Sequence, residues 1–193
     1  MSKTRSEQKQ ATHADILRSA QHLLRTKGIA GTSVAEVMKG AGLTVGGFYA
    51  HFESKDDLIE SVLRRTLGEM RAKLVGGLED ATSIERLERS LERYLSKAHR
   101  DRPAQGCPLP ASLGELSQAD ARLKSALADE IEGHVRALAG PELRTVALGL
   151  FALMVGGLSL ARALKGTALS QAVLDASIEL GRMALRQLPR NGA

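Results

Sequence analysis

Aromatic residues are scarce in this sequence, which has no Trp, two Tyr and three Phe among 193 residues. Val and Ile are also sparse beside Ala, Leu, Arg and Glu, so helix formers outnumber the residues that strands favour. An all-β sandwich or barrel is therefore not expected. The composition predicts an all-α fold.

Cysteine is almost absent, since Cys107 is the only one. A single cysteine cannot form an internal disulfide or supply a four-ligand zinc site, and the five histidines include no His-x-x-x-His pair. Residues 1–14 are polar and charged and lack the apolar core of a secretory signal. We expect a cytoplasmic protein that uses no metal and no cofactor.

Long hydrophobic runs are missing as well. The longest uncharged stretch is 145–161, which lies between Arg144 and Arg162. Its seventeen residues fall short of the roughly 20 that a bilayer-spanning helix needs, and three of them are glycines. We interpret this stretch as a helix buried on several sides and expect no membrane partner.

The positive charge is concentrated near the N-terminus. The chain has a net charge of +5, and residues 1–55 hold eight Lys and Arg against four Asp and Glu. The remaining residues are close to neutral. This distribution favours a polyanion-binding module joined to a neutral body.

Helical periodicity covers almost the whole chain. In the first quarter, Ser-x-x-Glu and Thr-x-x-Asp patterns are typical of helix starts, and glycines follow the apolar stripes. A proline-rich stretch, 99–110, interrupts the pattern in the middle of the chain, because proline lacks an amide donor. The predicted helices are 12–27, 33–42, 45–51, 54–74, 84–98, a short one through 113–116, 117–138, 141–164 and 170–188.

Two of these helices, 33–42 and 45–51, are short and are joined by a tight turn at Gly42, as a helix-turn-helix requires. In the second, Val45, Phe48 and Phe52 recur at helical spacing and are expected to face inward. Adjacent Gly46 and Gly47 cost roughly 1 kcal/mol each in helix stability relative to Ala. Close approach of this helix to a DNA major groove would justify that cost.

The stretch from Gly31 to Leu58, GTSVAEVMKGAGLTVGGFYAHFESKDDL, resembles the signature of TetR/AcrR-family transcriptional regulators. The resemblance implies an all-α homodimer with an N-terminal three-helix DNA-binding domain at 1–55. It implies a helical domain at 56–193 that binds a small-molecule effector and dimerises through its last two helices. Such proteins are mostly repressors that a ligand releases from double-stranded operator DNA, here a palindromic operator.

The resemblance also implies which residues meet DNA. Four would face base edges, two would reach phosphates or flanking bases, and three near helix starts would contact phosphates. The residues at base edges would be Thr44, Val45, Gly46 and Gly47. Those that reach phosphates or flanking bases would be Tyr49 and His51. Those near helix starts that contact phosphates would be Lys55, Thr32 and Ser33.

Apolar residues of the central helices are candidates to line an effector cavity, which predicts a largely apolar small molecule. The cavity candidates are Leu63, Leu67, Met70, Leu91, Tyr94, Cys107, Leu113 and Leu116. Apolar stripes and glycines on the last two helices predict a self-complementary dimer surface. Its candidates are Gly156, Gly157, Val173, Ser177, Leu180 and Ala184.

Cys107 supports an alternative function, a thiol-based sensor of oxidants or electrophiles. It precedes Pro108, which suits a helix first turn, and His99, Arg100 and Arg102 lie nearby in sequence. A helix N-terminus and cations both favour thiolate, so Cys107 is either an electrophile- or oxidant-sensing residue or a buried, inert one.

The sequence gives little support for an enzyme. The segment 40–46 has its last glycine one position late for a dinucleotide fingerprint, and no strand is expected before it. Residues 157–161 form a broken nucleophile elbow inside an apolar helix. We therefore expect no enzyme. An activator, or a DNA-binding regulator without an effector, remains an alternative to a repressor.

Overall fold

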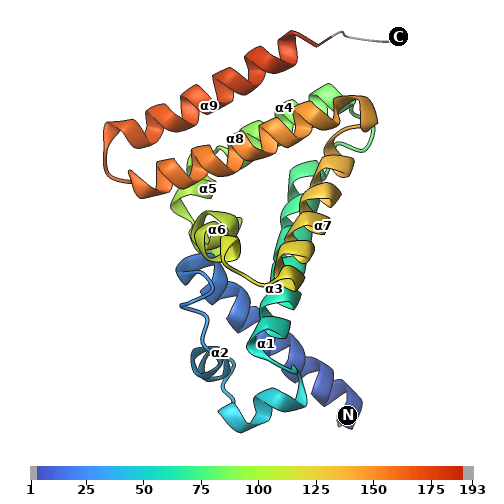
Figure 1. The fold of residues 1–193 in the computed structure, drawn as a ribbon, viewed down its shortest axis with the longest axis vertical. Helices are drawn as coiled ribbons and strands as arrows, with labels where there is room; N and C mark the ends of the chain where they lie inside the picture. The colour runs from blue at the N-terminus through green and yellow to red at the C-terminus, as the bar shows by residue number, and fades with distance from the viewer. Residues whose placement is uncertain (1–3, 189–193) are drawn as a thin grey trace. The chain divides into compact units, whose positions relative to one another are not determined.

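The computed structural model describes residues 4–188, and all regular structure in that range is helical (Figure 1). This confirms the all-α prediction. The elements are α1 (Arg5–Lys27), α2 (Val34–Gly40), the 3-10 helix η1 (Val45–Ala50), α3 (Lys55–Val75), α4 (Ser83–Tyr94), α5 (Lys97–Asp101), η2 (Pro103–Gln105), α6 (Leu109–Ser117), α7 (Ala121–Leu138), η3 (Pro141–Leu143), α8 (Arg144–Ala163) and α9 (Ala168–Arg186).

The chain divides into two compact units. The first contains the described residues up to Gly68 together with Cys107–Ala128, and the second contains Glu69–Gly106 and the described residues from Asp129 onward. Two of the three division points fall inside helices, α3 and α7, and the third lies between Gly106 and Cys107, before α6. The first unit therefore combines segments that are distant in sequence.

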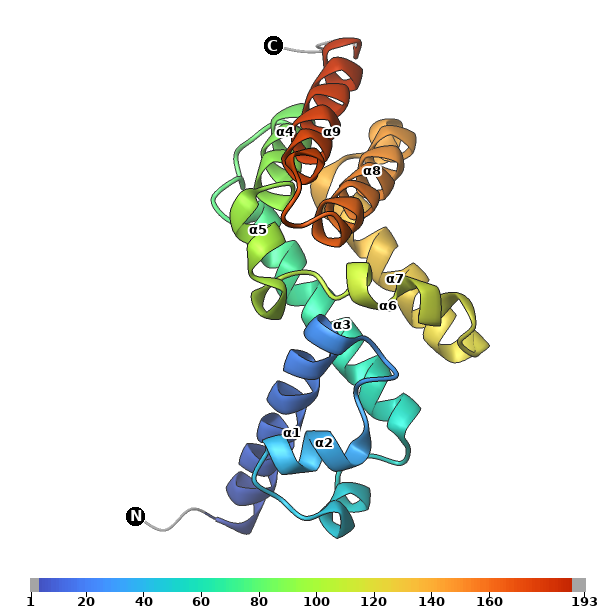
Figure 2. The ribbon, with the colours of Figure 1, turned by 90° about the vertical axis from the view of Figure 1, so that its left-hand side faces the viewer.

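In the first unit, α1 packs against both α2 and α6 (Figure 2). Helix α1 begins at Arg5, seven residues before the predicted start at Thr12, so that prediction was wrong. The reason is a capping box: the Glu7 carboxylate accepts from the Thr4 amide at 2.7 Å, and the Thr4 hydroxyl accepts from the Glu7 amide at 3.2 Å. The core of this unit includes fully buried Ile16 and Leu24.

In the second unit, α8 and α9 form an antiparallel pair, and α4 packs against both (Figure 1). Helix α9 begins at Ala168 instead of being capped by Ser170. The Ser170 hydroxyl is buried and donates to the Ala161 carbonyl at 2.6 Å, which ties α9 to the end of α8.

The apolar stretch lies in α8. By length and composition alone, Pro141–Ala163 is the one helix among residues 4–188 that is apolar enough to span a membrane. One side of α8 is buried against α4 and α9, while Gly149, Ala152 and Gly156 are exposed. This is the packing of a core helix with one open face.

Candidate nucleic-acid interface

The short element η1 is held to the first unit by aromatic side chains. Phe48 is fully buried and Phe52 is 3% exposed, and their rings stack with centroids 5.6 Å apart. The His13 ring of α1 stacks on Phe52 at 4.7 Å. The predicted inward positions of Phe48 and Phe52 are confirmed, and these rings fix the orientation of η1.

Val45–Ala50 is a 3-10 helix, so the α-helix expected there was wrong. The Gly47 amide donates to the Thr44 carbonyl at 3.1 Å, three residues back, and the glycine pair lowers the α-helix propensity. The tighter winding also moves Val45, which is 49% exposed instead of facing inward.

The outer face of η1 is open. Tyr49 is 73% exposed, its ring edge resting on Phe48 at 5.3 Å, and Thr44 makes no capping hydrogen bond with its hydroxyl. A Cβ added at Gly46 would meet no atom within 4 Å, and one at Gly47 would meet only Met38 Cε at 3.7 Å. The fold itself therefore does not require glycine at Gly46.

The N-terminus of α2 carries the next two predicted residues. Ser33 caps α2, because its hydroxyl accepts from the Glu36 amide at 3.2 Å. Thr32 is fully buried, and its hydroxyl donates to the Gly28 carbonyl at 2.7 Å. A phosphate contact through the Thr32 hydroxyl would have to replace that bond, whereas Ser33 is only half-buried.

Lys55 is the first residue of α3. The preceding Ser54 accepts from the Asp57 amide at 3.1 Å, and the Asp57 carboxylate accepts from the Glu53 amide at 3.2 Å. Asp57 is also paired with Arg122 of α7 at 3.0 Å. This pairing partly neutralises the Asp57 carboxylate, which lies two residues after Lys55.

A groove beside η1 was not foreseen from the sequence. It has a volume of about 620 Å³ and is lined by Arg5, Gln8, Lys9, Thr12, Ala50 and His51. The missed signal was Thr4-x-x-Glu7, which extends α1 and places Arg5 and Lys9 one turn apart on the same side of the helix. The groove thus adds two cations to the candidate interface.

His51 lies partly buried at the edge of this groove. Burial, followed by the charges of His13 and Lys9, lowers its pKa. Its buried Nδ1 has no hydrogen-bond partner among residues 4–188. The ring is 5.8 Å from that of His13, so its position is set by the same aromatic cluster that holds Phe52.

The loop before α2 is bound by α6, which sequence reasoning also missed. The Glu115 carboxylate accepts from the amides of Ile29 at 2.7 Å and Ala30 at 2.6 Å. Gly28 has φ of +73°, and a Cβ there would collide with this carboxylate. Glu115 therefore fixes the loop that leads directly to Thr32 and Ser33.

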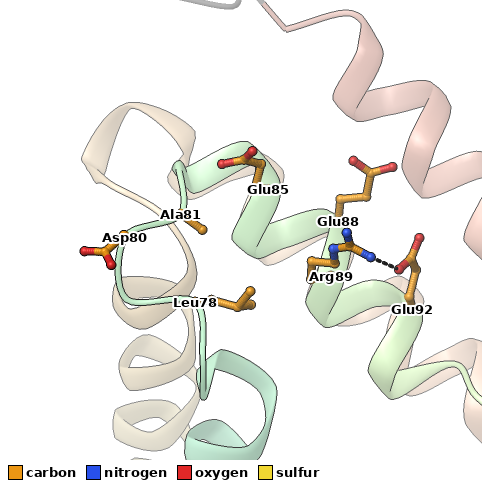
Figure 3. Close-up of a pocket in the computed structure, with 7 residues that line it drawn as sticks. All are labelled: Leu78, Asp80, Ala81, Glu85, Glu88, Arg89 and Glu92. Atoms are coloured by element: carbon orange, nitrogen blue, oxygen red, sulfur yellow. Dashed lines mark ion pairs between the residues drawn. The ribbon is translucent and has the colours of Figure 1, made fainter.

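The predicted effector residues are divided between the units. Leu63, Leu67, Cys107 and Leu116 are buried in the first unit, where Leu113 is 40% exposed, and Met70, Leu91 and Tyr94 are buried in the second. Surface pockets occur in the second unit. One, of about 600 Å³, is mostly acidic and is formed by the α3–α4 loop and α4 (Figure 3). A second pocket, of about 240 Å³, includes Met70.

The predicted dimer residues do not share one surface. Gly157 and Ser177 face each other within the chain, because a Cβ at Gly157 would lie 2.6 Å from the Ser177 hydroxyl. Gly156, Leu180 and Ala184 are exposed, and Val173 is half-buried. Leu160 of α8 and Met183 of α9 are also more than half exposed. Together with Gly156, Leu180 and Ala184 they make up the open apolar face of α8 and α9.

Comparisons with known proteins agree with this geometry. Residues 16–62 match the family model described as bacterial regulatory proteins, tetR family. The transcriptional repressor KstR2 of Rhodococcus jostii is 26% identical over 95 residues, covering 47% of each chain. The chain thus spans about half, or less, of the length of the curated relatives that it first matches.

Solved structures share the fold. A TetR-family regulator from Cytophaga hutchinsonii superposes with a TM-score of 0.78 at 20% identity over 100% of both chains. FadR from Bacillus subtilis, in complex with stearoyl-CoA, superposes with a TM-score of 0.65 at 18% identity, covering 86% of this chain and 96% of FadR. The helix-turn-helix segment, residues 16–62, thus matches the tetR family of bacterial regulatory proteins, and the chain shares its helical fold with solved TetR-family regulators.

Proposed function

We propose that this chain is a cytoplasmic homodimeric repressor that a small molecule releases from a palindromic operator. The division of labour follows the sequence-based domains, with DNA binding by residues 1–55 and effector binding and dimerisation by 56–193. The observation that carries the proposal is the outer face of η1, where exposed Tyr49 adjoins two glycines and the buried Phe48 holds the element in place.

DNA recognition would use this face in the major groove. Thr44, Val45, Gly46 and Gly47 would approach base edges, because none of their side chains is buried in the fold. Direct readout by such small side chains is modest, so backbone contacts and DNA shape would carry much of the specificity.

Phosphate contacts would flank that face. Lys55, Tyr49 and Ser33 are accessible for this role, and His51 lies at the rim of the adjoining groove. Arg5 and Lys9 line the same groove, and a duplex following it would bring its backbone to both cations. No enzyme activity and no membrane association are part of this proposal.

Dimerisation would cover the open apolar face of α8 and α9. Exposed Leu160, Leu180 and Met183 would leave apolar area in water in a monomer, and Gly156 with Ala184 permits close helix approach. A two-fold pair of η1 elements would then select inverted-repeat half-sites.

Two alternatives remain distinct from this proposal. A regulator without an effector, or an activator, would bind the same DNA but differ in its response to ligands or in operator position. A thiol sensor would act through Cys107, which is 1% exposed, and burial disfavours that role because an oxidant or electrophile must reach the sulfur.

The sharpest test is Gly46→Leu. The protein leaves space for this side chain, and φ at Gly46 is not positive, so the variant should fold while filling the space that a duplex needs. Duplexes enriched from a random library by the wild-type dimer should lose at least tenfold in affinity, measured by fluorescence anisotropy. Gly114→Leu on α6, where a Cβ also meets no atom within 4 Å, is the matched control.

Unchanged affinity of Gly46→Leu would refute the role of η1. A monomer by light scattering, with no duplex enriched, would refute the proposal as a whole. Circular dichroism of both leucine variants checks that their helical content is intact.

A further inference from the structure

A small pocket in the second unit carries positive charge without a carboxylate among its lining residues. It has a volume of about 240 Å³, below the roughly 300–1,000 Å³ typical of pockets for drug-sized ligands. Lys73 of α3, Arg93 of α4 and Arg102, which follows α5, all line it. The lining therefore attracts a small anion.

The Arg93 side chain is already hydrogen-bonded to backbone carbonyls of the protein. Its Nη1 donates to the carbonyls of Leu74 at 2.7 Å and Gly76 at 2.9 Å, which fixes the guanidinium against the C-terminal end of α3. Lys73 and Arg102 differ, because neither side chain has a hydrogen bond or ion pair in the described chain. These two cations are available to a ligand.

His99 contributes an uncharged wall. Its Nδ1 donates to the Tyr94 carbonyl at 2.7 Å, and its ring packs edge-on against Tyr94 at 4.6 Å. Burial, then Arg162 and Lys73, lowers the pKa of His99 to about 4. The ring is therefore neutral near pH 7 and does not compete with the two cations for an anion.

The remaining lining consists of the polar Gln105 and of three apolar residues. Met70 and Leu74 are both buried, and Ala98 lies at the more exposed side of the pocket. An inorganic anion would leave this apolar surface uncovered, whereas a ligand with a hydrocarbon part would cover it. The ligand is therefore expected to carry an apolar part as well as a negative charge.

We propose that this pocket binds a small amphiphilic anion, a carboxylate joined to a short apolar chain, with Lys73 and Arg102 holding the carboxylate and Met70 and Leu74 contacting the chain. That this ligand is the effector rests on the proposed function. The proposal refines the sequence-based expectation of a largely apolar effector by adding one negative charge.

Isothermal titration of the full chain without DNA tests the pocket by itself. Octanoate, 1-octanol and octylamine share one chain length and differ in charge, while acetate and inorganic phosphate lack the chain. Octanoate should bind at least tenfold more tightly than each of the other four. Equal affinity for octanol, equal affinity for phosphate, or no detectable octanoate binding would overturn the proposal.

Charge-removing variants locate the site. K73Q and R102Q should each weaken octanoate binding by about tenfold or more, as expected for the loss of one charge-assisted contact. K97Q is the matched control, because Lys97 is an exposed lysine of α5 that does not line the pocket. An equal loss in all three variants would indicate general charge attraction and would overturn the assignment, and thermal melts verify folding.

A separate measurement tests whether a ligand that binds this pocket also releases the chain from DNA. Octanoate is added to the wild-type complex with its selected duplex, and dissociation is followed by anisotropy. Release that is lost in K73Q supports the effector role. Octanoate binding without release overturns that role while the pocket assignment holds, and failure of duplex binding alone refutes the proposed function.

Discussion

The contact between Glu115 and the loop before α2 gives the most specific prediction. Its carboxylate accepts two backbone amides, of which the Ile29 bond is part-buried and the Ala30 bond is exposed. A hydrogen bond to an ionised acceptor contributes about 1.5–3 kcal/mol when shielded, and an exposed one contributes less because water replaces it. Glu115→Ala should therefore cost about 2–3 kcal/mol in the stability of this loop.

Glu115→Gln should cost roughly half as much, about 1 kcal/mol, because the amide side chain keeps one acceptor oxygen. Amide hydrogen exchange measures the effect locally: protection of Ile29 and Ala30 should fall at least tenfold in Glu115→Ala. Gln118→Ala, at the exposed end of α6, is the control and should leave both amides unchanged.

The same variants connect this contact to DNA binding. Loosening the loop frees Thr32 and Ser33 at the start of α2, so affinity for the selected duplex should fall in the order wild type, Gln, Ala. Unchanged protection of Ile29 and Ala30 in Glu115→Ala would refute the reasoning, whatever happens to DNA affinity.

Further predictions concern charge, packing and pH. Lys55→Gln should reduce the slope of log affinity against log salt concentration by about one, if one phosphate contact is lost; an unchanged slope would remove Lys55 from the interface. Gly157→Ala should destabilise the second unit by about 1–3 kcal/mol in urea denaturation, because its Cβ would meet the Ser177 hydroxyl at 2.6 Å, and adding Ser177→Ala should recover part of that loss. His99 has a pKa of about 4 in the folded chain, below its ordinary 6.5, so the unfolded chain binds more protons between these values. Its contribution, up to about 3 kcal/mol, is complete above pH 6.5 and is lost as the pH falls toward 4; His99→Asn should flatten that dependence.

Local signals in the sequence predicted the helices and the anchoring of η1. The Ser33 cap, the Gly42 turn and the spacing of Phe48 and Phe52 all act within a few residues, so periodicity and capping rules suffice for them. The signal for the early start of α1 was also local, because Thr4 and Glu7 form the cap. The apolar stripe begins later in the sequence, and for that reason the helix was predicted to start at Thr12.

Features that depend on distant partners were not predictable in this way. Glu115 meets a loop 86 residues away, and nothing in its own neighbourhood distinguishes it from other helix-surface glutamates. The same holds for Gly157 and Ser177, which both fit an apolar stripe, and only the packing of α8 on α9 reveals that they face each other within one chain.

The composition of the first unit determines when it can form during synthesis. Its helices α1 and α2 leave the ribosome early, but α6 and the first part of α7, which carry Glu115 and Arg122, lie beyond residue 107. At roughly 5–20 residues per second, the about 60 residues between Gly68 and Ala128 take about 3–12 s. During that interval the nascent helix-turn-helix lacks the contacts from α6 and α7, so chaperone dependence should be greatest in that window.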